Sequence, residues 1–95
     1  MAAKRSGQVT VTTAGTAVAG PSTPKGTVWQ LIAPSANTGV VYVGNDGADD
    51  VTAANGFVVS ETCPMIVHTT PGGSLAEYYF DAATNGDKIC WLKLE

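Results

Sequence analysis

The spacing of turn-forming residues is the feature that most constrains this chain. Short runs rich in β-branched residues alternate with clusters of Gly, Pro, Asn and Asp along the whole sequence. β-Branched side chains pack well on a pleated sheet and lose rotamer freedom in a helix, whereas Gly, Pro and Asn favour turns. No stretch has a convincing amphipathic helical pattern. The spacing therefore predicts short strands joined by turns.

Seven segments are expected as strands, and an eighth as a helical turn that leads into a strand. The strands are residues 8–13, 16–18, 28–32, 40–44, 57–60, 65–69 and 88–94; residues 74–80 form the eighth segment, with Ser74 as N-cap and Glu77 at the capping-box position. The predicted fold class is all-β, a small antiparallel β-sandwich or jelly-roll-like barrel of roughly 6–8 short strands. Residues 1–7 are expected as a flexible N-terminal arm and residues 8–95 as one domain.

Length and charge exclude several classes of protein. A chain of 95 residues forms one domain with a thin core, and self-association would help to stabilise it. The net charge of −3 argues against binding nucleic acid, which requires clustered Lys and Arg. The apolar runs are too short for a signal peptide or a membrane span, so no membrane association is expected. Cys63 and Cys90 are expected as reduced thiols.

The sequence offers little chemistry, so no enzymatic activity, cofactor or metal is expected. His68 is the only histidine, and it falls inside a predicted strand without the motif of a nucleophilic enzyme. Asp81 and Asp87 flank turns, where Asp commonly hydrogen-bonds the local backbone. Residues 45–50 hold one Asn and three Asp, a set of oxygen ligands that suits Ca²⁺, but their spacing does not match an EF-hand loop. A solvated loop is the preferred interpretation of this segment.

Three predicted strands are apolar on both faces, although a half-exposed sheet should alternate. They are residues 28–32, 40–43 and 89–92. With no helices to cover a second face, either a subunit interface or a compact sandwich with buried strand ends must do so. The interface is the preferred interpretation, and it makes Trp29 and Tyr42 candidate contacts.

Three segments together resemble small virion proteins of tailed bacteriophages. Residues 8–18 are similar to an opening strand and turn of these proteins, residues 37–44 to an "NTG-x-VYVG" segment, and Leu75 with residues 79–82 and 85–88 to a closing "L…YxDA…NGDK" segment. The resemblance spans about residues 8 to 92. It does not extend to residues 19–26 or to Cys63 and Pro64.

The resemblance implies a non-enzymatic capsid decoration (cement) or minor capsid protein. Such a protein binds the major capsid protein on the outside of the assembled shell and stabilises it, often as a homotrimer, after assembly in the host cytoplasm. The arm and the loop of residues 19–26 are the expected contact segments, because loops on rigid scaffolds commonly carry binding function. The candidate capsid or subunit contacts are Lys4, Arg5, Pro21, Pro24, Lys25, Trp29 and Tyr42.

Two alternative functions remain open at this stage. One is a tail-tip or head-fibre protein that contacts the host surface. The other is a small carbohydrate-binding β-sandwich, suggested by Trp29 and Trp91. Copy number per particle separates decoration from a tail-tip role, and glycan binding by the free protein would favour the lectin role.

Overall fold

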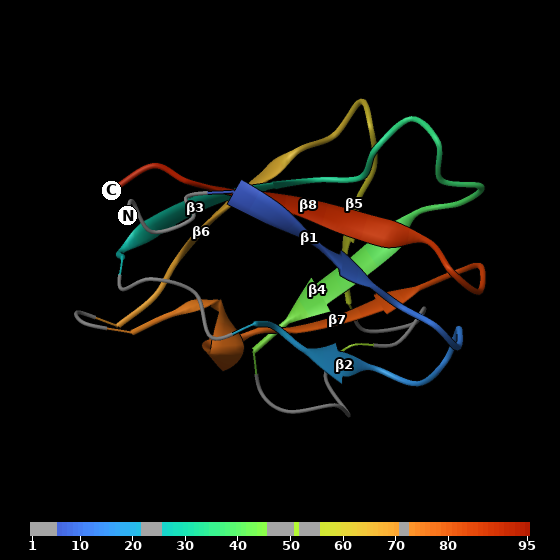
Figure 1. Ribbon diagram of the computed structural model, residues 1–95, viewed down its shortest axis with the longest axis horizontal. Helices are drawn as coiled ribbons and strands as arrows, with labels where there is room; N and C mark the ends of the chain where they lie inside the picture. Colours follow the sequence, from blue (N-terminus) through green and yellow to red (C-terminus); the bar gives the residue numbers. More distant parts are fainter. Residues whose placement is uncertain (1–5, 22–25, 46–50, 52–55, 71–72) are drawn as a thin grey trace.

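The computed structural model describes residues 6–21, 26–45, 51, 56–70 and 73–95. The chain forms two four-stranded sheets that pack face to face (Figure 1). Sheet A has the strand order β1-β8-β3-β6, and sheet B has the order β2-β7-β4-β5. All of the strand pairs are antiparallel. The two sheets form a small all-β sandwich with a jelly-roll strand order, so the predicted fold class is confirmed.

The strands are short, as the turn spacing predicts. Their bounds are β1 Ser6–Thr10, β2 Val18–Ala19, β3 Val28–Ile32, β4 Val41–Gly44, β5 Phe57–Val59, β6 Met65–His68, β7 Tyr79–Ala82 and β8 Lys88–Lys93. The 3-10 turn η2, Leu75–Glu77, is the one helical segment among the described residues. Most successive strands lie in opposite sheets; β4 and β5 pair directly with each other.

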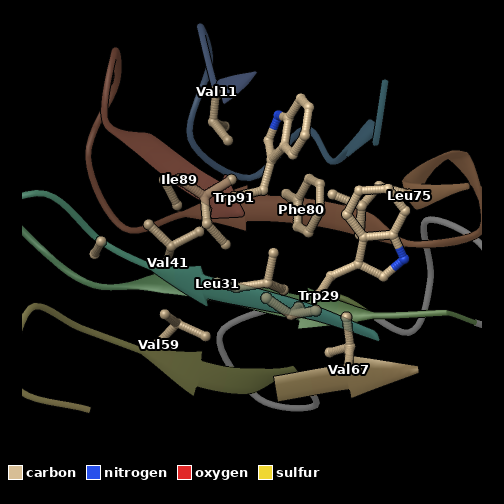
Figure 2. Close-up of a cluster of buried hydrophobic side chains, with 13 residues drawn as sticks. Val11, Trp29, Leu31, Val41, Val59, Val67, Leu75, Phe80, Ile89 and Trp91 are labelled. Carbon is tan, nitrogen blue, oxygen red and sulfur yellow. The ribbon is translucent and has the colours of Figure 1, made fainter. Parts of the chain in front are cut away.

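The core lies between the two sheets and is built from alternate residues of each strand. Sheet A contributes Trp29 and Leu31 of β3 with Ile89 and Trp91 of β8, and sheet B contributes Val41, Val43, Val59 and Phe80 (Figure 2). The two indole rings meet edge to face, with ring centroids 5.8 Å apart and an interplanar angle of 71°. The period of two places these side chains inward and leaves Gln30 on the opposite face.

The first strand begins earlier than the sequence predicts. Ser6 and Gly7 pair with Leu92 and Trp91 of β8, so these two residues belong to sheet A and not to a flexible arm. The physical reason is the missing side chain of Gly7. An added Cβ would lie 2.8 Å from the Trp91 ring, so only glycine lets the backbone cover the indole here. Residues 1–5 of the predicted arm lie outside the described residues.

Two of the predicted turns depend on glycine. Gly15 and Gly86 have φ angles of +88° and +83°, a region that residues with a Cβ rarely adopt. The predicted N-cap at Ser74 is confirmed, because its hydroxyl accepts a hydrogen bond from the amide of Ala76. The Glu77 carboxylate accepts from the amide and hydroxyl of Thr70, so it ties η2 to the end of β6, and it also has a backbone hydrogen bond with Ser74.

Gly20 gives a direct test of the packing between β2 and η2. It is buried, its amide donates to the Tyr78 carbonyl at 2.8 Å, and an added Cβ would collide with the Leu75 carbonyl. We expect Gly20→Ala to lower the free energy of unfolding by about 1–3 kcal/mol, because backbone and not a flexible side chain must move. Ala19→Ser, at an exposed neighbour, should change it by less than about 0.5 kcal/mol. Urea unfolding of both variants measures the difference.

Candidate functional site

The two turn motifs at residues 37–39 and 85–88 bind each other. The Asn37 side chain donates to the Lys88 carbonyl at 2.6 Å and accepts from the Lys88 amide at 2.9 Å, so it replaces a strand partner for β8. The Asp87 carboxylate accepts from the amides of Thr38 at 3.0 Å and Gly39 at 2.8 Å. Asp87 is only 5% exposed, and both of its oxygens are paired.

Two further side chains tie the β1–β2 turn to the same end of the sandwich. Asn85 accepts from the Ala14 amide at 2.7 Å, and Asp81 accepts from the Gly15 amide at 3.0 Å. The loops of residues 12–17, 33–40 and 83–87 all lie at this end, on the right of Figure 1. We call Asn37, Asp81, Asn85 and Asp87 the turn network.

The turn network assigns a structural role to most of the polar residues that carry the phage resemblance. Their side chains satisfy backbone amides and carbonyls of neighbouring loops, and no buried polar side-chain atom among the described residues lacks a hydrogen-bond partner. Asp81 and Asp87 thus act as the sequence predicts for turn aspartates, although they bind distant loops as well as local backbone. The turn network therefore holds the loops at this end of the molecule against one another.

Apolar side chains on the surface are the candidate binding feature. Five large ones are 44–68% exposed: Phe57, Val58, Ile66, Leu92 and Leu94. Phe57 and Val58 lie on β5, and Ile66 lies on β6; these two strands are edges of sheets B and A. Single exposed apolar residues are common, whereas large contiguous apolar patches commonly mark interaction surfaces.

A groove runs beside β6, between it and the ends of β4 and β5. Its volume is about 350 Å³, and it is lined by Val43, Gly44, Asn45, Phe57, Met65, Ile66, Val67, His68 and Tyr78. The Tyr78 hydroxyl donates to the His68 carbonyl at 2.5 Å. Burial and the neighbouring Glu77 carboxylate raise the pKa of Tyr78, so this hydroxyl keeps its proton at neutral pH.

The outer face of sheet A carries a second apolar hollow. It also measures about 350 Å³ and is lined by Ser6, Gln30, Ile32, Cys90, Trp91 and Leu92. Cys90 is half-buried there, and Cys63 is exposed in the turn before β6; both thiols are free. Leu92 belongs to a strand that was predicted to be apolar on both faces, and its side chain on the outer face remains 44% exposed.

The predicted contact residues fall into three groups. Lys4, Arg5, Pro24 and Lys25 lie outside the described residues, as do residues 46–50 of the segment interpreted as a solvated loop. Pro21 is half-buried after β2, and Tyr42 is 9% exposed, opposite Val58 in sheet B. The expectation for Trp29 is wrong: it is fully buried, because it occupies an inward position of β3 and donates to the Thr69 hydroxyl at 3.3 Å.

The exposed large apolar residues of β5 and β6 were not predicted as contacts. Phe57, Val58 and Ile66 belong to strands that the sequence analysis predicts, but strand order in the sheets decides which strands become edges. The available signal was the lack of charge in residues 57–59 and 65–68, since protected edges usually carry charges or prolines.

The contact between Glu77 and Thr70 makes stability depend on pH. Hydrogen bonds from Thr70 lower the pKa of Glu77 below its usual 4.5. A carboxyl with a lowered pKa in the folded state stabilises the fold above the unfolded pKa, and this contribution is lost as the pH falls from 4.5 through the folded value.

We expect Glu77→Gln to remove that part of the acid dependence. The free energy of unfolding of the variant should fall less than that of the wild type between neutral pH and pH values below 4.5, where Glu77 becomes protonated. Urea unfolding across this range measures it. Glu61→Gln, at an exposed position in the β5–β6 turn, is the matched control; a wild-type slope in Glu77→Gln would contradict the assignment.

The described residues hold no group of three or more His, Cys, Asp or Glu side chains that could bind a metal ion. Within the same residues, no helix has the length and apolarity needed to cross a membrane.

Comparison of the chain with protein-family models, with curated proteins and with solved structures gave no match in any of the three.

Proposed function

We propose that the chain is a non-enzymatic structural protein of a tailed bacteriophage that decorates the outer surface of the assembled capsid and stabilises it. Its partner in this role is the major capsid protein, and its site of action is the exterior of the virion. The exposed apolar side chains of β5, β6 and β8 carry the proposal, because apolar surface is stabilised when a partner covers it.

The architecture supports a binding role over a catalytic one. The polar side chains of the turn network are engaged with backbone groups of the fold. Jelly rolls occur in viral capsid and lectin domains, which is an analogy at the level of the fold and not of a site. The motif resemblance favours the viral branch of that analogy.

The buried tryptophans weaken the carbohydrate alternative. Trp29 and Trp91 are 0% and 6% exposed and pack against each other, so neither presents a ring face to a sugar. The tail-tip or head-fibre alternative uses the same exposed surfaces, and copy number per particle separates it from decoration.

The test uses phage shells that lack the protein. A protein that binds the assembled shell and not the free subunits stabilises the shell by linkage, with RT ln(1 + [L]/Kd) at each site. We expect saturable binding at many copies per shell and a higher temperature of shell disruption. Binding at a few copies, confined to one vertex, would instead support a tail role, and no binding to any expanded shell would reject decoration.

A further inference from the structure

The β6 edge is a sheet edge without acidic or basic Asp, Glu, Lys or Arg side chains. We use this name for Pro64 together with β6, Met65–His68, which is the outermost strand of sheet A. Natural edge strands are commonly blunted by charged side chains, especially Lys, by prolines, by bulges or by being very short. β6 contains neither Lys, Arg, Asp nor Glu, and its central side chain, Ile66, is 58% exposed.

The hydrogen bonds of β3 fix the direction of the backbone groups on this edge. Leu94 donates its amide to the Val28 carbonyl at 2.8 Å, so the polar groups of Val28 face β8. In a strand these groups alternate from side to side, and those of Trp29 therefore face β6. Trp29 is paired with Val67 in the register, so Val67 points toward β3.

By the same alternation, the amides and carbonyls of Ile66 and His68 point away from β3. None of the described residues bonds to either group of Ile66, so this residue offers both a donor and an acceptor. The His68 carbonyl accepts from the Tyr78 hydroxyl, and His68 thus offers only its donor. Two positions before Ile66 stands Pro64, which has a carbonyl but no N–H.

This set of donors and acceptors is complementary to itself. We propose that two copies of the chain pair through their β6 edges, antiparallel, about a two-fold axis that passes between the two Ile66 residues. Each Ile66 then donates to and accepts from Ile66 of the second copy. The free His68 amide of each copy lies opposite Pro64 of the other, whose carbonyl accepts it. Every outward group that the edge leaves open gains a partner.

The side chains fit the same register. In antiparallel pairing, opposite residues share a face, so the two Ile66 side chains meet on the outer face and Met65 lies opposite Val67 on the inner face. β6 itself brings no carboxylate or ammonium group to the axis, although each copy carries a net charge of −3. The outer hollow of sheet A would continue across an eight-stranded sheet.

The edge is small, and this sets the expected strength. The contact consists of four backbone hydrogen bonds and a few apolar side chains. The surface area that it buries is therefore smaller than the roughly 1,200 Å² that stable complexes bury. We therefore expect a dimer that dissociates on dilution. The pairing does not depend on a capsid, so its failure and that of the proposed decoration role are separable.

Sedimentation equilibrium and amide hydrogen exchange of the full chain, from about 10 µM to about 1 mM, test the pairing, since weak interfaces associate in this range. The expected result is a monomer–dimer equilibrium, with exchange of the Ile66 and His68 amides slowed at least about 5-fold at the high end. Ile66→Lys should remove the dimer, because it places two like charges at the axis. Leu92→Lys, at an exposed residue of the same sheet away from the edge, should retain it.

Three results would overturn the proposal. A monomer at every concentration excludes pairing between two copies. If the protein is a monomer and Ile66→Lys also fails to bind shells, the β6 edge pairs with a strand of the capsid protein instead. A trimer, which the phage resemblance favours, is incompatible with a two-fold axis. A dimer that survives Ile66→Lys and is lost in Leu92→Lys would show that the outer faces pack together and that the edges do not pair. Circular dichroism establishes that both variants keep the fold.

Discussion

Replacing Trp29 with alanine should remove much of the stability of the domain. The side chain is fully buried in the core and packs edge to face on Trp91 (Figure 2). Its indole N–H donates to the Thr69 hydroxyl. Truncating a buried Trp costs about 3–5 kcal/mol, through lost burial and the cavity left behind. A domain of this length has roughly 5–14 kcal/mol in total, so we expect the melting temperature to fall by at least about 12 °C.

The matched controls separate burial from the loss of an aromatic ring or of a large side chain. Trp29→Phe keeps an apolar ring and should cost less than Trp29→Ala. Leu92→Ala removes a side chain that is 44% exposed on the outer face of the same sheet, and it should cost less than about 1 kcal/mol. If Trp29→Ala and Leu92→Ala melted at the same temperature, the inward position of Trp29 would be refuted.

Local sequence patterns predicted the strands well, because their signals act over a few residues. The apolar runs mark β3, β4 and β8 within one or two residues, and the turn at Asn85 and Gly86 follows from glycine's freedom. The start of β1 was missed because Ser6 and Gly7 have no strand signal of their own. They join the sheet since Gly7 fits against Trp91, a contact between residues 84 positions apart.

The candidate site was less predictable, because exposure depends on the order of strands in the sheets. Both Trp29 and Ile66 are large apolar residues in short strands, and the only local difference is the polar Gln30 beside Trp29. Trp29 faces the opposite sheet, whereas Ile66 lies on an edge strand. The polar Gln30 between Trp29 and Leu31 is consistent with an alternating strand, in which Trp29 faces inward. The structure follows this alternation, and not the expectation that both faces of β3 contact a partner.

Removing the carboxylate of Asp87 should have the second large effect. Its two oxygens accept from the amides of Thr38 and Gly39, and its own carbonyl accepts from the Val11 amide, so it joins three loops at one end of the sandwich. Hydrogen bonds to a charged group contribute about 1.5–3 kcal/mol each, and a buried amide without a partner costs about 1–3 kcal/mol. We expect Asp87→Ala to lower the free energy of unfolding by about 2–5 kcal/mol.

Two variants show whether the carboxylate itself matters. Asp87→Asn keeps one acceptor oxygen but turns an N–H₂ group toward an amide donor, so its loss should be intermediate. Glu61→Ala removes the same charge from an exposed turn and should change stability by less than about 0.5 kcal/mol. Hydrogen exchange provides the local readout, because the Thr38 and Gly39 amides should exchange faster in Asp87→Ala while those of β6 are affected only through global unfolding. Equal stability of Asp87→Ala and Glu61→Ala would mean that the two motifs of the phage resemblance are not held together by this carboxylate.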